Sequence, residues 1–197
     1  MRAPDKRMND GQTSELSPAA KAALQELELQ AVRLRAGLAH FDDLIRAADG
    51  VLNAGIYSHE LAQVALFLEK HESALSGPFL RGVEELGLNP PKDEDGMIWY
   101  LLRQYIGEMV EGKISPERGG ARIFEEVDLH FNLYEKIKRY VGDSHGYQNI
   151  IGLYHAYDDV RPERFPEVDL ALIEACREWM REYGGVERSS LNHRKDP

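Results

Sequence analysis

The sequence predicts an all-α protein, namely a single-domain, irregular helical bundle of about seven or eight helices that begins with a long amphipathic helix. Three observations support this fold class. Apolar residues recur at spacings of three and four along most of the chain. Proline and glycine occur at the intervals that are typical of helix starts and ends. The one segment with β-propensity, residues 149–154, has no second strand with which to pair.

The length of the chain limits it to one domain. A chain of 197 residues and 22.4 kDa buries about 70% of its unfolded surface, which is enough for one core and too little for two ordinary domains. Residues 1–13 and 184–197 are polar and charged, so we expect them to be disordered tails. The predicted helical domain therefore covers residues 14–183.

The first predicted helix runs from about residue 18 to residue 52. Ser17 supplies an N-cap and Pro18 suits the first helical position. Alternating steps of three and four place nine apolar residues on one narrow stripe: Leu24, Leu27, Ala31, Leu34, Leu38, Phe41, Ile45, Ala48 and Leu52. Such a stripe packs either against its own domain or against a second copy, so both a monomer and a homodimer through this helix remain open.

The remaining helices follow from their start and stop signals. Ser58, Asp95 and the Ser115-Pro116 pair start helices, while Gly77-Pro78, Gly87 and Gly112 interrupt the pattern. The expected helices cover about residues 59–73, 79–86, 95–111, 116–130, 132–141, 147–160 and 166–183.

The charge and composition exclude several classes of function. The chain has 34 acidic and 24 basic residues, a net charge of −10, which argues against a dedicated nucleic-acid binder. Since each tail carries +1, the predicted folded body carries −12. The single cysteine, Cys176, excludes an internal disulfide and a multi-cysteine zinc site. No apolar run approaches the ~18 residues of a membrane span, and no signal-peptide core is visible, so we expect a soluble, cytoplasmic protein without membrane contact.

The acidic body predicts a protein that binds a basic protein partner, with no catalytic residues and no cofactor. Binding hot spots commonly combine aromatic anchors with charged groups that lose water on binding. Two segments have this composition, and their candidate partner-binding residues are Asp93, Glu94, Asp95 and Trp99 in the first and Tyr154, Tyr157, Asp158 and Asp159 in the second.

Two further segments carry a resemblance to a family. Residues 114–124, Ile-Ser-Pro-Glu-Arg-Gly-Gly-Ala-Arg-Ile-Phe, and residues 151–159, Ile-Gly-Leu-Tyr-His-Ala-Tyr-Asp-Asp, resemble a pattern of small all-helical bacterial proteins of unknown function, roughly I-S-P-x-x-G-A-x-x-I-W. The chain departs from it at Gly120 and Phe124. The resemblance implies an association with toxin immunity, in which the basic partner is a toxin. Physically, Gly119 and Gly120 predict a corner where another helix approaches closely.

An enzyme is the alternative hypothesis. Glu108 and Glu111, followed by Glu125 and Asp128, resemble the E-x-x-E…E-x-x-D pattern of all-helical MazG-type nucleotide pyrophosphohydrolases. The resemblance implies that these four carboxylates hold Mg²⁺ and a triphosphate. Helical periodicity instead places Glu111 roughly opposite the apolar face of its helix. The partner-binding protein is therefore the first prediction, and the Mg²⁺-dependent enzyme is the second.

Overall fold

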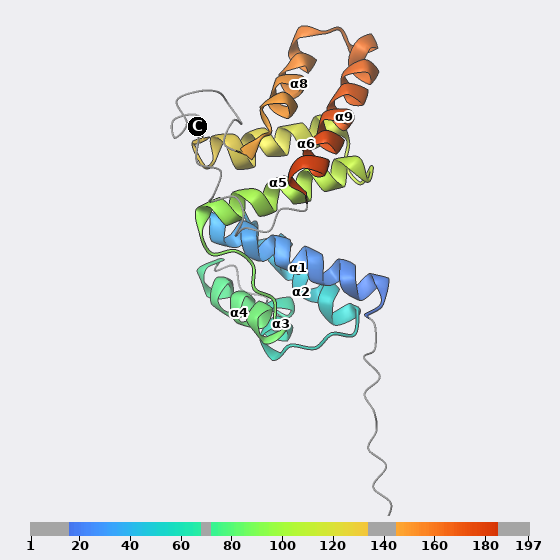
Figure 1. The fold of residues 1–197 in the computed structure, drawn as a ribbon. Helices are drawn as coiled ribbons and strands as arrows, with labels where there is room; N and C mark the ends of the chain where they lie inside the picture. The colour runs from blue at the N-terminus through green and yellow to red at the C-terminus, as the bar shows by residue number, and fades with distance from the viewer. Residues whose placement is uncertain (1–15, 68–71, 134–144, 185–197) are drawn as a thin grey trace, which may run out of the picture.

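All regular secondary structure is helical in the part of the chain that the computed structural model describes, residues 16–67, 72–133 and 145–184 (Figure 1). The predicted all-α class is confirmed. The elements are α1 (Pro18–Ala36), α2 (Phe41–Asn53), α3 (His59–Ala65), α4 (Glu72–Glu85), α5 (Glu94–Val110), α6 (Pro116–Arg122), the π-helical segment η1 (Ile123–Leu129), α8 (Gln148–Asp159), the 3₁₀ turn η3 (Pro162–Arg164) and α9 (Phe165–Tyr183). The predicted tails, apart from Gly184, and most of the helix predicted at 132–141 lie outside these residues.

Side-chain caps start four of these helices at, or within two residues of, the predicted start. Ser17, Ser58, Asp93 and Ser115 each accept a hydrogen bond from the backbone N–H three residues later, at 3.1, 3.2, 2.9 and 3.3 Å. Each bond satisfies an N–H group that the first turn of a helix leaves without an intrahelical acceptor. Pro18 and Pro116 occupy first-turn positions, where a missing N–H costs little.

The single helix predicted over 18–52 is wrong, because the chain reverses after Ala36. Gly37 has a φ of 76°, which favours glycine, and its N–H bonds to the carbonyl of Leu34 at 3.1 Å. The N–H of Leu38 bonds to the carbonyl of Arg33 at 2.8 Å, so α1 ends in a Schellman-type cap. The stripe therefore folds onto itself between α1 and α2. A continuous 18–52 dimer seam does not form, while the oligomeric state stays a prediction.

The helices form two layers, with α1–α4 in one and α5–α9 in the other (Figure 1). The N-terminal cluster of buried residues lies within the first layer, and the C-terminal cluster lies mostly within the second. Helix α1 serves both: Leu27 and Ala31 belong to the N-terminal cluster, while Leu29 and Val32 belong to the C-terminal cluster. Two sides of α1 are thus buried, whereas the apolar spacing predicted one stripe. Among the described helices, none combines the length and apolar character that crossing a bilayer requires.

Two other helix boundaries differ from the prediction. Pro78 lies inside α4 instead of marking a break, even though proline in a helix interior removes a backbone hydrogen bond. Leu75, Phe79 and Val83 of this helix are at most 1% exposed, and their burial offsets that loss. Helix α3 ends at Ala65 rather than at residue 73, and Leu66, which follows it, is 77% exposed.

The close approach predicted at Gly119 and Gly120 is confirmed. A Cβ atom on Gly119 would lie 2.3 Å from the Met109 side chain of α5, and one on Gly120 would lie 2.7 Å from the Tyr154 ring of α8. Neither distance leaves room for a methyl group. Helix α6 is therefore in direct contact with both neighbours, and this contact positions Tyr154 beside α6.

We expect Gly120→Ala to lower the free energy of unfolding by up to about 2 kcal/mol, because an overpacking cost of about 1–3 kcal/mol is partly offset by a gain in helix propensity of about 1 kcal/mol. Gly152→Ala in α8 is the matched control, since a Cβ there meets no atom within 4 Å. This control should be neutral or stabilising. Urea unfolding measures both variants, and equal stabilities would contradict the close approach.

Candidate functional site

The first candidate segment, at the start of α5, has its aromatic residue in the core and its three carboxylates at the surface. Trp99 is 6% exposed, and its ring lies 5.8 Å from those of both Trp179 and Tyr183. This burial removes Trp99 as an exposed anchor. Asp93, Glu94 and Asp95 are exposed, and they occupy the end of the helix whose dipole favours negative charge. Negative charge at this position stabilises the helix.

Asp95 also meets a buried histidine. Its Oδ1 lies 3.1 Å from Nε2 of His145. The His145 ring is tilted against that of Trp99, with 4.9 Å between the ring centroids. Burial lowers the pKa of His145 below the ordinary value, although Asp95 opposes this shift. The contacts of Asp95 with His145 and of His145 with Trp99 therefore connect the N-terminus of α5 to the core.

The second candidate segment, at the end of α8, is more open. Asp158 and Asp159 are exposed and Tyr154 is half-buried. Tyr157 is 8% exposed, and its hydroxyl donates a hydrogen bond to Asp169 of α9. Burial, followed by this bond, raises the pKa of Tyr157. Tyr157 thus holds α8 against α9, which leaves Tyr154 as the aromatic side chain available at the surface.

The structure brings acidic residues from two further elements to Tyr154. Burial raises the pKa of Tyr154, and the negative charges of Glu125, Asp158 and Glu117 raise it further. These carboxylates come from η1, α8 and α6. We use the term Tyr154 surface for the following residues: Tyr154, Glu117, Glu125, Asp158 and Asp159.

Two neighbouring aromatic rings contact Tyr154. Phe124 lies 5.9 Å from Tyr154 between ring centroids, and the ring of His155 lies 5.3 Å from Tyr154. Such pairs fix the ring of Tyr154 in place. Within the described ranges, none of the four carboxylates of this surface forms an ion pair with a basic side chain.

The position of Asp158 and Asp159 is electrostatically unfavourable for the isolated protein. Both lie in the last turn of α8, where the helix dipole is negative, and that turn contains no basic residue. The repulsion is strongest at low salt. A cation placed against this surface would therefore be stabilised by both the carboxylates and the helix end.

The four carboxylates of the enzyme hypothesis do not come together. Glu108 accepts a hydrogen bond from Gln104 at 2.7 Å, and Glu111 pairs with Lys113 at 2.6 Å. Asp128 is 3% exposed and accepts a 2.7 Å hydrogen bond from Tyr147, while Glu125 belongs to the Tyr154 surface. Across 16–67, 72–133 and 145–184, no three His, Cys, Asp or Glu side chains are arranged to hold a metal ion. The four carboxylates thus lie in different environments, and the enzyme stays an alternative hypothesis.

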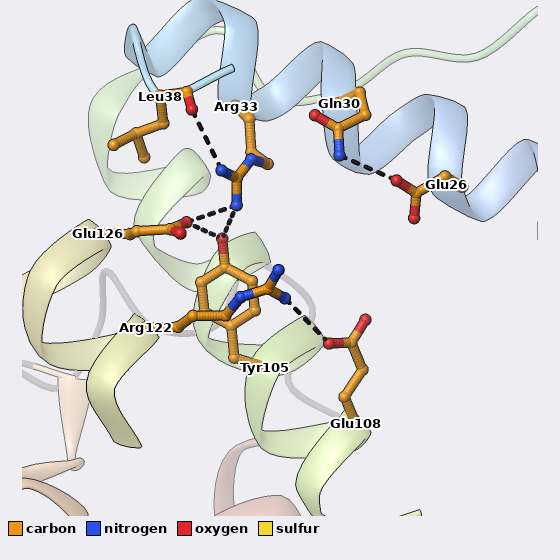
Figure 2. A network of polar contacts seen from close by, with 8 residues as sticks. All are labelled: Glu26, Gln30, Arg33, Leu38, Tyr105, Glu108, Arg122 and Glu126. Carbon is orange, nitrogen blue, oxygen red and sulfur yellow. Dashed lines mark hydrogen bonds and ion pairs between the residues drawn. The ribbon is translucent and has the colours of Figure 1, made fainter. Parts of the chain in front are cut away.

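Sequence reasoning missed a buried polar network at the junction of α1, α5 and η1 (Figure 2). Arg33 is 6% exposed, and its guanidinium donates to Glu126 at 2.6 Å and to Tyr105 at 3.1 Å. It also donates to the carbonyl of Leu38 at 3.2 Å. Burial raises the pKa of Tyr105, and Glu126 raises it further against the opposing effect of Arg33. The sequence signal that could have indicated the burial of Arg33 is its position four residues after the apolar Leu29, because residues four apart share one face of a helix.

No family model, curated protein or solved structure matches this chain. The function therefore has to be argued from the geometry.

We expect Glu126→Gln to lower the free energy of unfolding by about 3 kcal/mol, because it leaves the buried charge of Arg33 without its carboxylate. The double variant Arg33→Met with Glu126→Gln should recover part of that loss, since it removes the buried charge as well. Urea unfolding of the two single variants and the double variant gives the coupling. Additive losses would contradict a coupled pair.

We expect the protonation of His145 to lower the free energy of unfolding in acid. In the folded state its pKa lies below the ordinary value of 6.5, so the unfolded chain binds more protons and stability falls as pH decreases through about 6.5. The His145→Gln variant should therefore lose less stability than the wild type between about pH 7.5 and about pH 5.5. Urea unfolding at several pH values measures the slopes, with His40→Gln, at an exposed histidine, as the matched control. Equal slopes for the wild type and His145→Gln would contradict the assignment.

Proposed function

We propose that this protein binds a basic protein partner through the Tyr154 surface. The observation that carries the proposal is the gathering of three carboxylates, Glu117 of α6, Glu125 of η1 and Asp158 of α8, around one half-buried tyrosine, with Asp159 next to Asp158 in the chain. Within the described ranges these carboxylates lack ion-pair partners, so the lysine and arginine side chains of a partner would supply the missing positive charge. Tyr154 would provide the apolar contact area at the centre.

The net charge of the chain supports the same kind of partner. A charge of −10 attracts a basic protein over distances of about 8–10 Å at moderate salt and repels nucleic acid. A basic active cleft, such as that of an enzyme acting on phosphate backbones, is a surface of complementary charge. In its specific form, the proposal is that the protein acts in the cytoplasm, as the sequence predicts. Its partner would then be a toxin, as the resemblance implies.

The proposal is tested with immobilised full-length protein and a lysate of its own cell. The captured protein is identified, purified and titrated against the wild type and against a variant carrying Asp158→Lys and Asp159→Lys. We expect a basic partner whose affinity falls as salt rises, and we expect the variant to weaken binding by about tenfold or more, equivalent to about 1.4 kcal/mol.

A charge-matched control separates this surface from the overall charge. The control carries Asp42→Lys and Asp49→Lys, which change the net charge equally at exposed positions of α2 in the other layer (Figure 1). It should retain most of the affinity, after circular dichroism shows that both variants fold. Equal weakening by the two variants, or salt-insensitive binding, would refute a partner site at Tyr154.

A further inference from the structure

A pocket of about 470 Å³ lies where α1 and α5 pack against each other at the boundary between the two layers (Figure 1). We call it the α1–α5 pocket. Its lining comprises Gln25 and Glu28 of α1, Gly96, Trp99, Tyr100, Arg103 and Gln104 of α5, and Asn89 and Pro91 of the segment before α5. The volume is within the range of about 300–1,000 Å³ that small-molecule sites occupy. The pocket is therefore large enough for a small organic ligand.

Glu28 brings to this pocket a carboxylate that no positive side chain balances. It is half-buried, and within the described residues it forms no ion pair. The hydroxyl of Tyr100 donates to it at 3.3 Å, which is longer than the usual O–H···O range of about 2.5–3.0 Å. A partly buried carboxylate loses hydration, and one long hydrogen bond replaces little of it. Glu28 can therefore accept hydrogen bonds from a ligand that carries positive charge.

Arg103 brings a positive charge to the same pocket. No ion pair joins it to Glu28, so the two opposite charges line one pocket without neutralising each other. A ligand with positive charge alone would be repelled by Arg103, and a ligand with negative charge alone would be repelled by Glu28. The guanidinium group has five N–H donors in a geometry that matches a carboxylate. The lining therefore favours a ligand that carries both charges.

The pocket between α1, α2 and α6 differs in this respect. It has a volume of about 400 Å³, and the arginines that line it are Arg33, Arg46, Arg118 and Arg122. Glu26 and Asp43 belong to the same lining, while Glu126 pairs with Arg33 and Glu108 pairs with Arg122. These carboxylates balance the arginines, so that pocket has no comparable charge for a ligand to complete.

We propose that the α1–α5 pocket binds a free α-amino acid with an apolar side chain. The ammonium group of the ligand donates to the carboxylate of Glu28, and its carboxylate accepts from the guanidinium of Arg103. Pro91 and the ring of Tyr100, which are half-buried and line the pocket, provide apolar contact area for the ligand side chain. No residue of the Tyr154 surface lines this pocket, so the proposal stands whether or not a basic protein binds there.

Calorimetric titration of the full chain with L-phenylalanine and L-leucine tests the proposal. We expect at least one of them to bind with a Kd below about 1 mM. The controls for each amino acid are the corresponding amine, which lacks the carboxylate, and the N-acetyl derivative, which lacks the ammonium charge. Both controls should bind about tenfold or more weakly than the amino acid, because each leaves one charged side chain of the pocket without its partner.

A variant at Glu28 tests the same contact from the side of the protein. Glu28→Gln keeps the size of the side chain and removes its charge, so it should weaken amino-acid binding by about tenfold or more. The matched control is Glu167→Gln, at an exposed glutamate of α9 that pairs with Arg164, and it should bind as the wild type does. Thermal unfolding without ligand shows that each variant is folded.

Three results would overturn the proposal. The first is that neither amino acid binds at about 10 mM. The second is that the amine or the N-acetyl derivative binds as tightly as the amino acid, which would mean that the two charges are not both recognised. The third is that Glu28→Gln and Glu167→Gln bind the amino acid equally. The first two results come from the wild type alone, so they decide the question even if Glu28→Gln fails to fold.

Discussion

The pairing of Arg33 with Glu126 is the interaction on which the arrangement of the two layers depends. A guanidinium that is 6% exposed requires a carboxylate and further acceptors, because an unpaired buried charge costs several kcal/mol. Glu126, Tyr105 and the carbonyl of Leu38 meet this requirement from three parts of the chain. The pair joins α1 to η1 at the boundary between the N-terminal and C-terminal clusters, and so restricts how the layers meet. Apolar contacts alone would allow more sliding, since they are less directional.

The Arg33–Glu126 pair positions α6 and η1 so that their acidic side chains lie towards Tyr154 and their basic side chains lie towards α1 and α2. Glu117 and Glu125 act on Tyr154 of α8, while Arg118 and Arg122 line the pocket against α1 and α2. The close packing of Gly119 and Gly120 on α5 and α8 holds the segment in that position. A single stretch of chain, residues 116–129, thus contributes to the Tyr154 surface and to the pocket between α1, α2 and α6. Acids and bases that alternate along the sequence are separated in space by the turn of the helix.

Local signals predicted much of the helix content but failed where a turn competed with periodicity. The caps at Ser17, Ser58 and Ser115 and the close approach at Gly119 depend on short-range geometry, which the sequence displays directly. At Gly37 the apolar stripe continues unbroken through a left-handed residue, so its periodicity hid a chain reversal. At Pro78 the opposite happened, because burial of its neighbours kept a helix that local propensity would break. The exposure of the candidate site residues could not be predicted from the sequence for the same reason. Trp99 and Asp158 both have acidic and aromatic neighbours in the sequence, yet Trp99 is buried and Asp158 is exposed.

The sequence by itself determined the all-α class, the starts of several helices, the acidity of the chain and the close contact at Gly119 and Gly120. These properties depend on composition or on residues within one helical turn of each other. Only the tertiary structure decided that Arg33 meets Glu126, that Glu117 and Glu125 join Asp158 beside Tyr154, and that four arginines share one pocket. Those associations join residues up to 93 positions apart, and they are set by how helices pack, which no local pattern records.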